Sequence, residues 1–340
     1  MDAPSKDLSH PQGPRENLRI FFSGFAMGTA DLVPGVSGGT MAFILGIYET
    51  LINAIKSFNL DVARLLLRGQ WREALAAIPL RFLSALGLGM VTAILALVRF
   101  LTWMLEEHPD YLFAFFFGLV VASIIAIGVQ VARWDVWTIG GFIVGTLFAL
   151  LIVTQNPVGD DNHSYPVLFF SGMIAIMAMI LPGISGSFIL LILGQYHYVL
   201  SAVRELQLDV IFMVGMGCAI GITIFARVLS WLLRTYEMVT LAVLTGFMMG
   251  SLWKIYPWRA ASNANLGEAA DHAEEFTVPV VPTDVASTEE IFFALFLMVV
   301  GFIVVTALDH MQSRKNPVVV AVWRVLGRRL QPGEASSASD

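Results

Sequence analysis

The sequence has little charge and almost no cysteine. Asp, Glu, Lys and Arg make up 14% of its 340 residues, whereas ordinary soluble domains carry about 25%. The single cysteine, Cys218, excludes a disulfide framework within the chain. Motifs that bind zinc, nucleotides or redox cofactors are also missing, so we expect no metal, no cofactor and no nucleic-acid partner. With 57% hydrophobic residues and a mean hydropathy of +0.74, the composition predicts an all-α polytopic membrane protein.

Most apolar runs have the roughly 20 residues that a membrane-spanning helix needs, but two runs are longer and are interrupted. The first is broken by "VPGVSGG" at 33–39 and the second by "LPGISGS" at 181–187. A proline inside a helix removes a hydrogen bond and clashes with the preceding turn, so each run must break there. The helix before the first break, 20–33, would span roughly 21 Å, short of the roughly 30 Å hydrocarbon core. We therefore expect two re-entrant hairpins that reach the membrane midplane.

The chain also repeats itself. Residues 21–55 align without a gap on residues 169–203 with 14 identities, and the similarity continues from 87–105 to 215–233. Each copy holds one hairpin and three helices, so it crosses the membrane an odd number of times and the second copy is inverted. We expect the chain to begin with a polar cytoplasmic segment without a cleavable signal peptide (1–19) and to end with a basic cytoplasmic tail (309–340). Repeat 1 (20–154) is expected to contain a re-entrant hairpin (20–55), an interfacial helix (60–78) and three transmembrane helices (80–105, 111–130, 137–154). Repeat 2 (165–308) is expected to contain a re-entrant hairpin (165–202), three transmembrane helices (209–233, 238–257, 290–308) and an external insertion (258–289).

The basic residues indicate the orientation. With the N-terminus in the cytoplasm, 15 of the 20 Lys and Arg residues lie on the cytoplasmic side, and only Arg204, Lys254 and Arg259 lie outside. This asymmetry follows the positive-inside rule, so we expect both termini in the cytoplasm.

The two breaks are the candidate binding site. After each break, serine and threonine side chains are placed to cap the half-helix that follows. The exposed amides and the helix dipole there would attract an anion. Because Gly-Ser patterns also let helices pack closely in lipid, a purely structural role stays open. The candidate substrate-binding residues at the breaks are Asp31, Pro34, Gly35, Ser37, Gly38, Gly39, Thr40, Pro182, Gly183, Ser185, Gly186 and Ser187.

Two arginines within predicted spans, Arg99 and Arg227, occupy matching positions of the repeat. An arginine at the centre of a membrane helix costs about 2.5–3.5 kcal/mol on insertion scales, so it needs a reason. Both side chains could snorkel to the headgroups. Alternatively, two forked donors that face one anion would bind a phosphate bidentately, and we add both residues to the candidate substrate site.

Three titratable residues are candidates for proton coupling. Asp31 and Glu49 flank the first break, and the repeat places Met179 and His197 at their positions in the second copy. A carboxylate near an anion site could carry a proton. Asp31 could equally accept a hydrogen bond from the exposed backbone, and His197 could simply lie at the interface beside two tyrosines.

"ADLVPGVSGGTMAFILGIYE" at 30–49, together with "ILPGISGSFILLILGQY" at 180–196, resembles the bacterial polyprenyl-phosphate transporter family, formerly a domain of unknown function. The resemblance implies a plasma-membrane translocase that returns undecaprenyl phosphate from the outer to the cytoplasmic leaflet for cell-envelope synthesis. It also implies that the lipid is the partner and that the two breaks form the site. The second copy departs from the pattern at Met179 and Ser187, so one half could hold the full anion-binding chemistry.

Two other functions remain open. Undecaprenyl-diphosphate phosphatases also use inverted re-entrant hairpins, with a "PGxSRS" type motif. Here Gly38 and Gly186 replace the arginine of that motif, which favours a transporter over an enzyme. The other alternative is a transporter of a small soluble anion.

Overall fold

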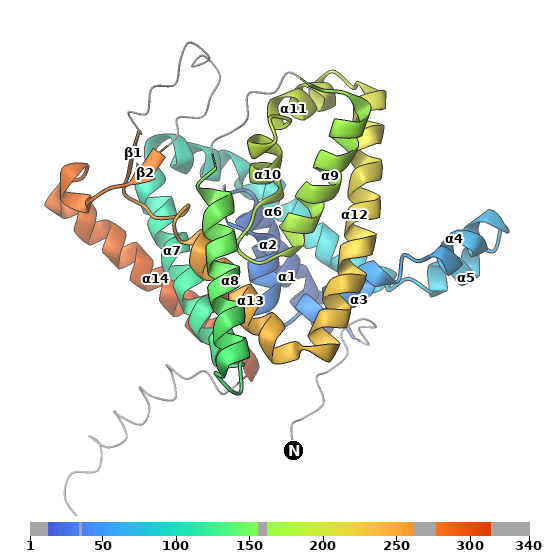
Figure 1. Ribbon diagram of the computed structural model, residues 1–340, viewed down its shortest axis with the longest axis horizontal. Helices are drawn as coiled ribbons and strands as arrows, with labels where there is room; N and C mark the ends of the chain where they lie inside the picture. Colours follow the sequence, from blue (N-terminus) through green and yellow to red (C-terminus); the bar gives the residue numbers. More distant parts are fainter. Residues whose placement is uncertain (1–12, 34–35, 156–161, 262–276, 314–340) are drawn as a thin grey trace, which may run out of the picture.

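The computed structural model describes residues 13–33, 36–155, 162–261 and 277–313, and it consists mainly of helices (Figure 1). Five of these helices are long and apolar enough to cross a membrane. Two bent helix pairs raise the number to seven if each pair counts as one span. The chain is thus an all-α, multi-pass membrane protein, as its composition predicts.

The helices follow one order twice, except that two short helices between the first hairpin and the first long helix have no counterpart in the second half. The first half contains α1 (Pro14–Asp31), α2 (Gly38–Ile44), α3 (Tyr48–Lys56), α4 (Leu60–Leu67), α5 (Trp71–Ala76), α6 (Leu80–Glu107), α7 (Pro109–Gly128) and α8 (Val136–Val153). The second half contains α9 (Tyr165–Ile180), α10 (Gly186–Ile192), α11 (Tyr196–Arg204), α12 (Leu208–Thr235), α13 (Glu237–Ser251) and α14 (Thr288–Ser313). Helices at matching positions often match in length: α2 and α10 have 7 residues each, α3 and α11 have 9, and α6 and α12 have 28. The repeat in the sequence is therefore also a repeat of helices.

Both hairpins have one more bend than the sequence predicts. The axes of α2 and α3 differ by 118°, and those of α10 and α11 differ by 112°. Gly46 and Gly194, which the repeat aligns, lie at these bends with φ of +62° and +69°. Glycine adopts this left-handed conformation without a side-chain clash and commonly ends a helix. The second arm of each hairpin is therefore two short helices.

Other predicted boundaries also need correction. α1 begins at Pro14 rather than at residue 20, because proline suits the first helical position, where no amide donor is needed. The predicted interfacial helix 60–78 is two helices, since Gly69 turns the chain with a φ of +74°. α13 ends at Ser251 instead of continuing to residue 257, and α14 continues to Ser313.

The predicted external insertion has some regular structure. Its strands β1 (Arg259–Ala261) and β2 (Thr277–Pro279) pair antiparallel, and a short 3-10 helix, η1 (Pro282–Asp284), follows them. Most of the predicted N-terminal segment and basic tail, like the centre of the insertion, lies outside the described residues.

Glycines bring the first helix of each hairpin close to a long helix of the same half. α1 packs along α6, where a Cβ on Gly24 would meet the carbonyl of Leu86 and a Cβ on Gly89 would meet a carbonyl of α1. α9 packs along α12 in the same way through Gly172 and Gly217. Small residues let helix backbones approach, which is a main source of helix association in lipid.

The other long helices each pack against a helix of the opposite half. α7 packs on α14, and α8 packs on α13. Glycines again mark the closest approaches, with Gly118 against the Met298 backbone and Gly246 against the Phe142 backbone. The two halves therefore interlock, and the hairpin helices α2 and α10 lie within the bundle (Figure 1).

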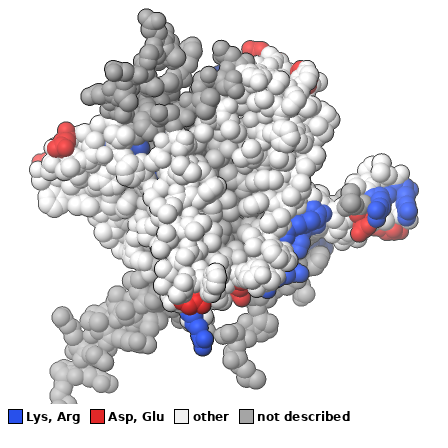
Figure 2. Space-filling view, in the orientation of Figure 1, with Lys and Arg blue, Asp and Glu red and all other residues white. Residues whose placement is uncertain are grey.

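The outer surface is apolar across its middle. Figure 2 shows that charged side chains leave most of the centre of this face free and gather at its ends and on the projecting helices α4 and α5. The spans expose large apolar side chains, for example Leu95, which is 76% exposed on α6. A patch of this extent suits a lipid surrounding rather than water.

Candidate functional site

The tips of the two hairpins meet and are joined by hydrogen bonds. The Tyr48 hydroxyl, at the start of α3, donates to the Ile180 carbonyl over 3.0 Å. The Thr40 hydroxyl of α2 accepts from the Gly183 amide over 3.0 Å. α9 ends at Ile180, so backbone groups there have lost their helical partners. The first hairpin replaces these partners, as an apolar surrounding requires.

Ser37 caps the first tip, which confirms the prediction for this residue. Its hydroxyl accepts from the Gly39 amide over 3.1 Å and lies 3.4 Å from the carbonyl oxygens of Met179 and Leu181. Thr40 contacts the second hairpin instead of capping its own helix. Ser37 and Thr40 are 1% and 0% exposed, so both hydroxyls of this tip are used inside the protein.

At the same tip, the Asp31 carboxylate takes the place that the sequence assigned to a ligand anion. Its Oδ1 accepts from the Gly38 amide over 2.7 Å. A Cβ on Gly38 would meet this carboxylate, so a larger residue there would require the Asp31 side chain to move. The hydrogen bond to the backbone, one of the two roles left open for Asp31, is therefore present. The predicted site residues Pro34 and Gly35 lie outside the described residues.

The second tip is not closed in this way. The predicted cap at Ser185 is wrong, because its hydroxyl makes no bond to the start of α10 and pairs with the Ser187 hydroxyl over 2.8 Å. Ser187, predicted as a second cap, is exposed. Met179, at the position that Asp31 holds in the first half, brings no carboxylate.

The remaining predicted residues of the second tip are buried and shape its turn. Pro182, Gly183 and Gly186 are all buried. Gly183 adopts a φ of +93°, and a Cβ there would meet the Ser251 hydroxyl of α13. The second tip thus packs against the end of α13.

The two predicted arginines do not join the tips. Arg99 is exposed on α6. Arg227 is half-buried on α12 and donates from Nη1 to the Thr223 carbonyl, one turn back in its own helix, over 2.7 Å. Within the described part of the chain, no hydrogen bond or ion pair links either guanidinium to Ser37, Thr40 or Ser185. The structure therefore does not bring the two forked donors together around one anion.

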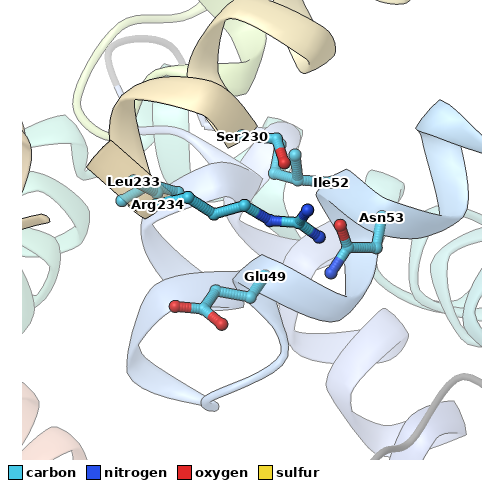
Figure 3. Close-up of a pocket in the computed structure, with 6 residues that line it drawn as sticks. All are labelled: Glu49, Ile52, Asn53, Ser230, Leu233 and Arg234. Carbon is cyan, nitrogen blue, oxygen red and sulfur yellow. The ribbon is translucent and has the colours of Figure 1, made fainter. Parts of the chain in front are cut away.

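Glu49 and His197, the other predicted titratable residues, lie on α3 and α11 and take no part in the hydrogen bonds between the tips. A small pocket between α3 and α12 is lined by Glu49, Ile52, Asn53, Ser230, Leu233 and Arg234 (Figure 3). The Glu49 carboxylate points away from the Arg234 guanidinium, which extends toward Asn53 (Figure 3). His197 is exposed and its ring meets that of Tyr196 edge-on.

Three residues that the sequence did not single out contribute contacts. Tyr48 bonds the second hairpin, and its identity with Tyr196 in the repeat is a signal that could have drawn attention to it. Lys56, at the end of α3, donates from Nζ to the Ser230 hydroxyl of α12 over 2.8 Å. Lys254 follows α13, and its Nζ lies 4.7 Å from the ring centroid of Phe188 on α10. Nothing local in the sequence links Lys254 to the second tip.

Known proteins resemble this chain over most of its length. A family described as undecaprenyl phosphate translocase-like matches residues 27–272, a region that contains the tips of both hairpins. A polyprenyl-phosphate transporter from Vibrio cholerae serotype O1 is 42% identical over 247 residues, which cover 71% of this chain and 78% of that protein. A polyprenyl-phosphate transporter from Staphylococcus aureus is 30% identical over 254 residues, which cover 69% of this chain and 84% of that protein. No solved structure matches. The chain is therefore a member of the undecaprenyl phosphate translocase-like family.

Proposed function

We propose that this protein transports undecaprenyl phosphate, or a related polyprenyl phosphate, across the membrane. Both relatives are named polyprenyl-phosphate transporters. The observation that carries the proposal is the meeting of two polar hairpin tips inside a bundle with an apolar outer surface. A lipid monophosphate has a charged head that suits such a polar interior and an isoprenoid tail that suits the surrounding bilayer.

In this proposal the two halves are inverted repeats. Each half contributes three membrane crossings, α6 to α8 or α12 to α14, and one hairpin that returns to its starting side. Figure 1 supports hairpin entry from opposite sides, since α3 lies toward the lower end of the bundle and α11 toward its upper end. The packing of α7 on α14 and of α8 on α13 also fits a two-fold relation between the halves.

The transport runs from the outer to the cytoplasmic leaflet of the bacterial inner membrane and recycles the carrier lipid of cell-envelope synthesis. Both termini lie in the cytoplasm, which is supported by the 15 of 20 basic residues on that side. The first hairpin then enters from the cytoplasm, and the second enters from outside. An outer-leaflet headgroup therefore reaches the second tip, where Ser187 is exposed.

Reconstitution in liposomes tests the transport. Labelled undecaprenyl phosphate is placed in one leaflet, and its movement is followed with and without a pH gradient. We expect movement that depends on the protein, and a rate that responds to the gradient if Asp31, Glu49 or His197 carries protons. A liposome that moves a soluble anion but no lipid would overturn the proposal. Phosphate release from undecaprenyl diphosphate would assign an enzyme activity instead.

The arginines provide a second test. We expect Arg99→Ala and Arg227→Ala each to slow lipid movement by at least about tenfold, because a guanidinium bond to a phosphate contributes roughly 1.5–3 kcal/mol. Arg133→Ala, a change in the loop before α8, is the matched control. Normal transport by both variants would remove the arginines from the mechanism.

A further inference from the structure

The last helices of the two hairpins, α3 and α11, pack differently on the long helices. α3 crosses to the opposite half and lies along the end of α12, where Ile52 lines a small pocket together with Ser230 and Leu233 (Figure 3). α11 stays in its own half and packs on the start of α12, with Ala202 buried beside Val210. If the halves packed alike, α11 would lie along the end of α6. Within the described residues, a hairpin therefore contacts the long helix of the opposite half at one end of the bundle and has no contact of that size at the other.

A hydrogen bond holds α3 on α12. Lys56, the last residue of α3, donates from Nζ to the Ser230 hydroxyl over 2.8 Å. Ser230 is 5% exposed and Lys56 is half-buried. A charged donor makes this bond stronger than one between neutral groups. If α3 moved away, water could reach both groups, so the contact can open without leaving either of them unsatisfied.

The repeat places the same two kinds of group at the other end. Arg204 is the last residue of α11, as Lys56 is of α3. Thr102 stands at the position of α6 that Ser230 holds in α12, a helix of equal length. Both counterparts are exposed, and in the part of the chain that the structure describes neither side chain forms a hydrogen bond. One end thus has a bonded donor and acceptor, and the other end has the same pair apart.

The residues around the second pair suit a contact between α11 and α6. Leu200 on α11 and Leu105 on α6 occupy the positions of the two apolar residues in the pocket between α3 and α12. Glu106 lies one turn after Thr102, on the same face of α6. If α11 lay along this face, Arg204 would meet a hydroxyl and a carboxylate, which are both acceptors for a guanidinium.

The shapes of the hairpins indicate how such a contact could form. Their bends, at Gly46 and Gly194, are nearly equal at 118° and 112°. The hairpins therefore differ less in shape than in how they lie against the long helices. Rigid-body movement of one repeat against the other produces a difference of this kind in transporters built from inverted repeats.

We propose that the contact of α3 with α12, held by Lys56 and Ser230, is a gate that closes the cytoplasmic side of the hairpin tips. A second gate, formed by α11 on α6 through Arg204 and Thr102, closes the outer side when the first gate opens. This inference rests on the proposed transport function and on its inverted halves. The structure is then the outward-open state, in which a headgroup from the outer leaflet reaches the second tip. The cytoplasmic gate must open before the headgroup can leave on the other side.

Paired cysteines in the full-length protein test the two gates. In a Cys218→Ser background in liposomes, one variant combines Lys56→Cys with Ser230→Cys, and the other combines Arg204→Cys with Thr102→Cys. A short bifunctional methanethiosulfonate is added to each. We expect both pairs to crosslink, and each crosslink to slow the movement of labelled undecaprenyl phosphate by at least about tenfold, because a locked gate stops the cycle. A reducing agent should restore the movement.

The outer pair has a matched control. Val203 is also exposed on α11, but it lies on a different face from its neighbour Arg204. Val203→Cys should therefore not crosslink to Thr102→Cys. The outer gate is overturned if Arg204→Cys and Thr102→Cys never crosslink in an active protein, if the control pair crosslinks equally, or if the crosslink leaves transport unchanged. If the unsubstituted protein moves no lipid, the transport function itself fails.

A single substitution tests whether the gates are coupled. Lys56→Met keeps a long side chain but removes its hydrogen bond, so the population should shift toward the state in which the outer gate is closed. Thr102→Cys, at the far end of the bundle, should then react at least about twofold more slowly with a small charged thiol reagent. Arg68→Met, which removes an exposed basic side chain at the end of α4, should leave this rate unchanged. A purely local role of Lys56 would not alter a reaction at Thr102, so a rate unchanged by Lys56→Met, or lowered equally by both substitutions, would refute the coupling.

Discussion

Tyr48→Phe removes one hydroxyl from the contact between the hairpins. Tyr48 is 3% exposed, and its hydroxyl donates to the Ile180 carbonyl over 3.0 Å. Within the described residues, no backbone amide donates to the Ile180 carbonyl in place of this hydroxyl. α9 ends at Ile180, and the Ile184 amide donates to the Leu181 carbonyl instead. The substitution keeps the ring but leaves a buried carbonyl unsatisfied, which costs about 1–3 kcal/mol. We expect the free energy of unfolding to fall by that amount.

The repeat supplies a control for this prediction. Tyr196 occupies the matching position in the second half, and its ring meets His197 with no hydrogen bond from its hydroxyl in the described structure. Tyr196→Phe should therefore change the free energy of unfolding by less than about 0.5 kcal/mol. Reversible unfolding in mixed micelles with increasing SDS measures both. Equal destabilisation by the two substitutions would refute the reasoning, because only Tyr48 bonds to the Ile180 carbonyl.

Three further predictions follow from the packing and the caps. Gly24→Leu should prevent α1 from packing on α6 and abolish the folded protein in size-exclusion chromatography, while Gly87→Leu on the same helix pair, where a Cβ meets nothing within 4 Å, should fold normally. Asp31→Asn keeps an acceptor for the Gly38 amide at the first tip and should fold, whereas Asp31→Ala should lower the free energy of unfolding by about 1–3 kcal/mol. If Asp31→Asn also removes the response of transport to a pH gradient, the carboxylate carries the proton. The backbone amide and the hydroxyl of Thr138 both donate to the Asp135 carboxylate and lower its pKa, so this cap stabilises α8 at neutral pH and is lost as the pH falls below that lowered pKa. The protection factors of the Trp137 and Thr138 amides, which are exchange rates corrected for the intrinsic effect of pH, should then fall, and unchanged protection factors at low pH would contradict this.

The local features of the hairpins follow from the sequence. Proline and glycine predict the break, and the serine that follows predicts the cap at Ser37, because each of these effects acts within a few residues. The additional bend at Gly46 is also readable in principle, since a glycine after a short apolar run is a common helix end. The prediction missed it because a continuous apolar run resembles one helix.

The contacts between the hairpins are not predictable in this way. Ser37 and Met179 are separated by 142 positions, and Tyr48 and Ile180 by 132. Their pairing depends on how two bundles of helices pack, which leaves no local pattern. The repeat also misleads here, because similar sequences predict equal tips. The two tips differ at a few positions, among them Asp31 against Met179 and Gly39 against Ser187, and their hydrogen bonds differ.

The packing of α7 and α8 on α14 and α13 affects when the bundle can assemble during synthesis. During synthesis, α7 and α8 leave the ribosome before their main partners exist, so their glycine-bearing faces stay unpaired until α13 and α14 have been inserted. Assembly of the bundle is therefore a late event, completed only after α13 and α14 have been made. A chain cut after α8 has no such partners, unless a second copy of the same half supplies them.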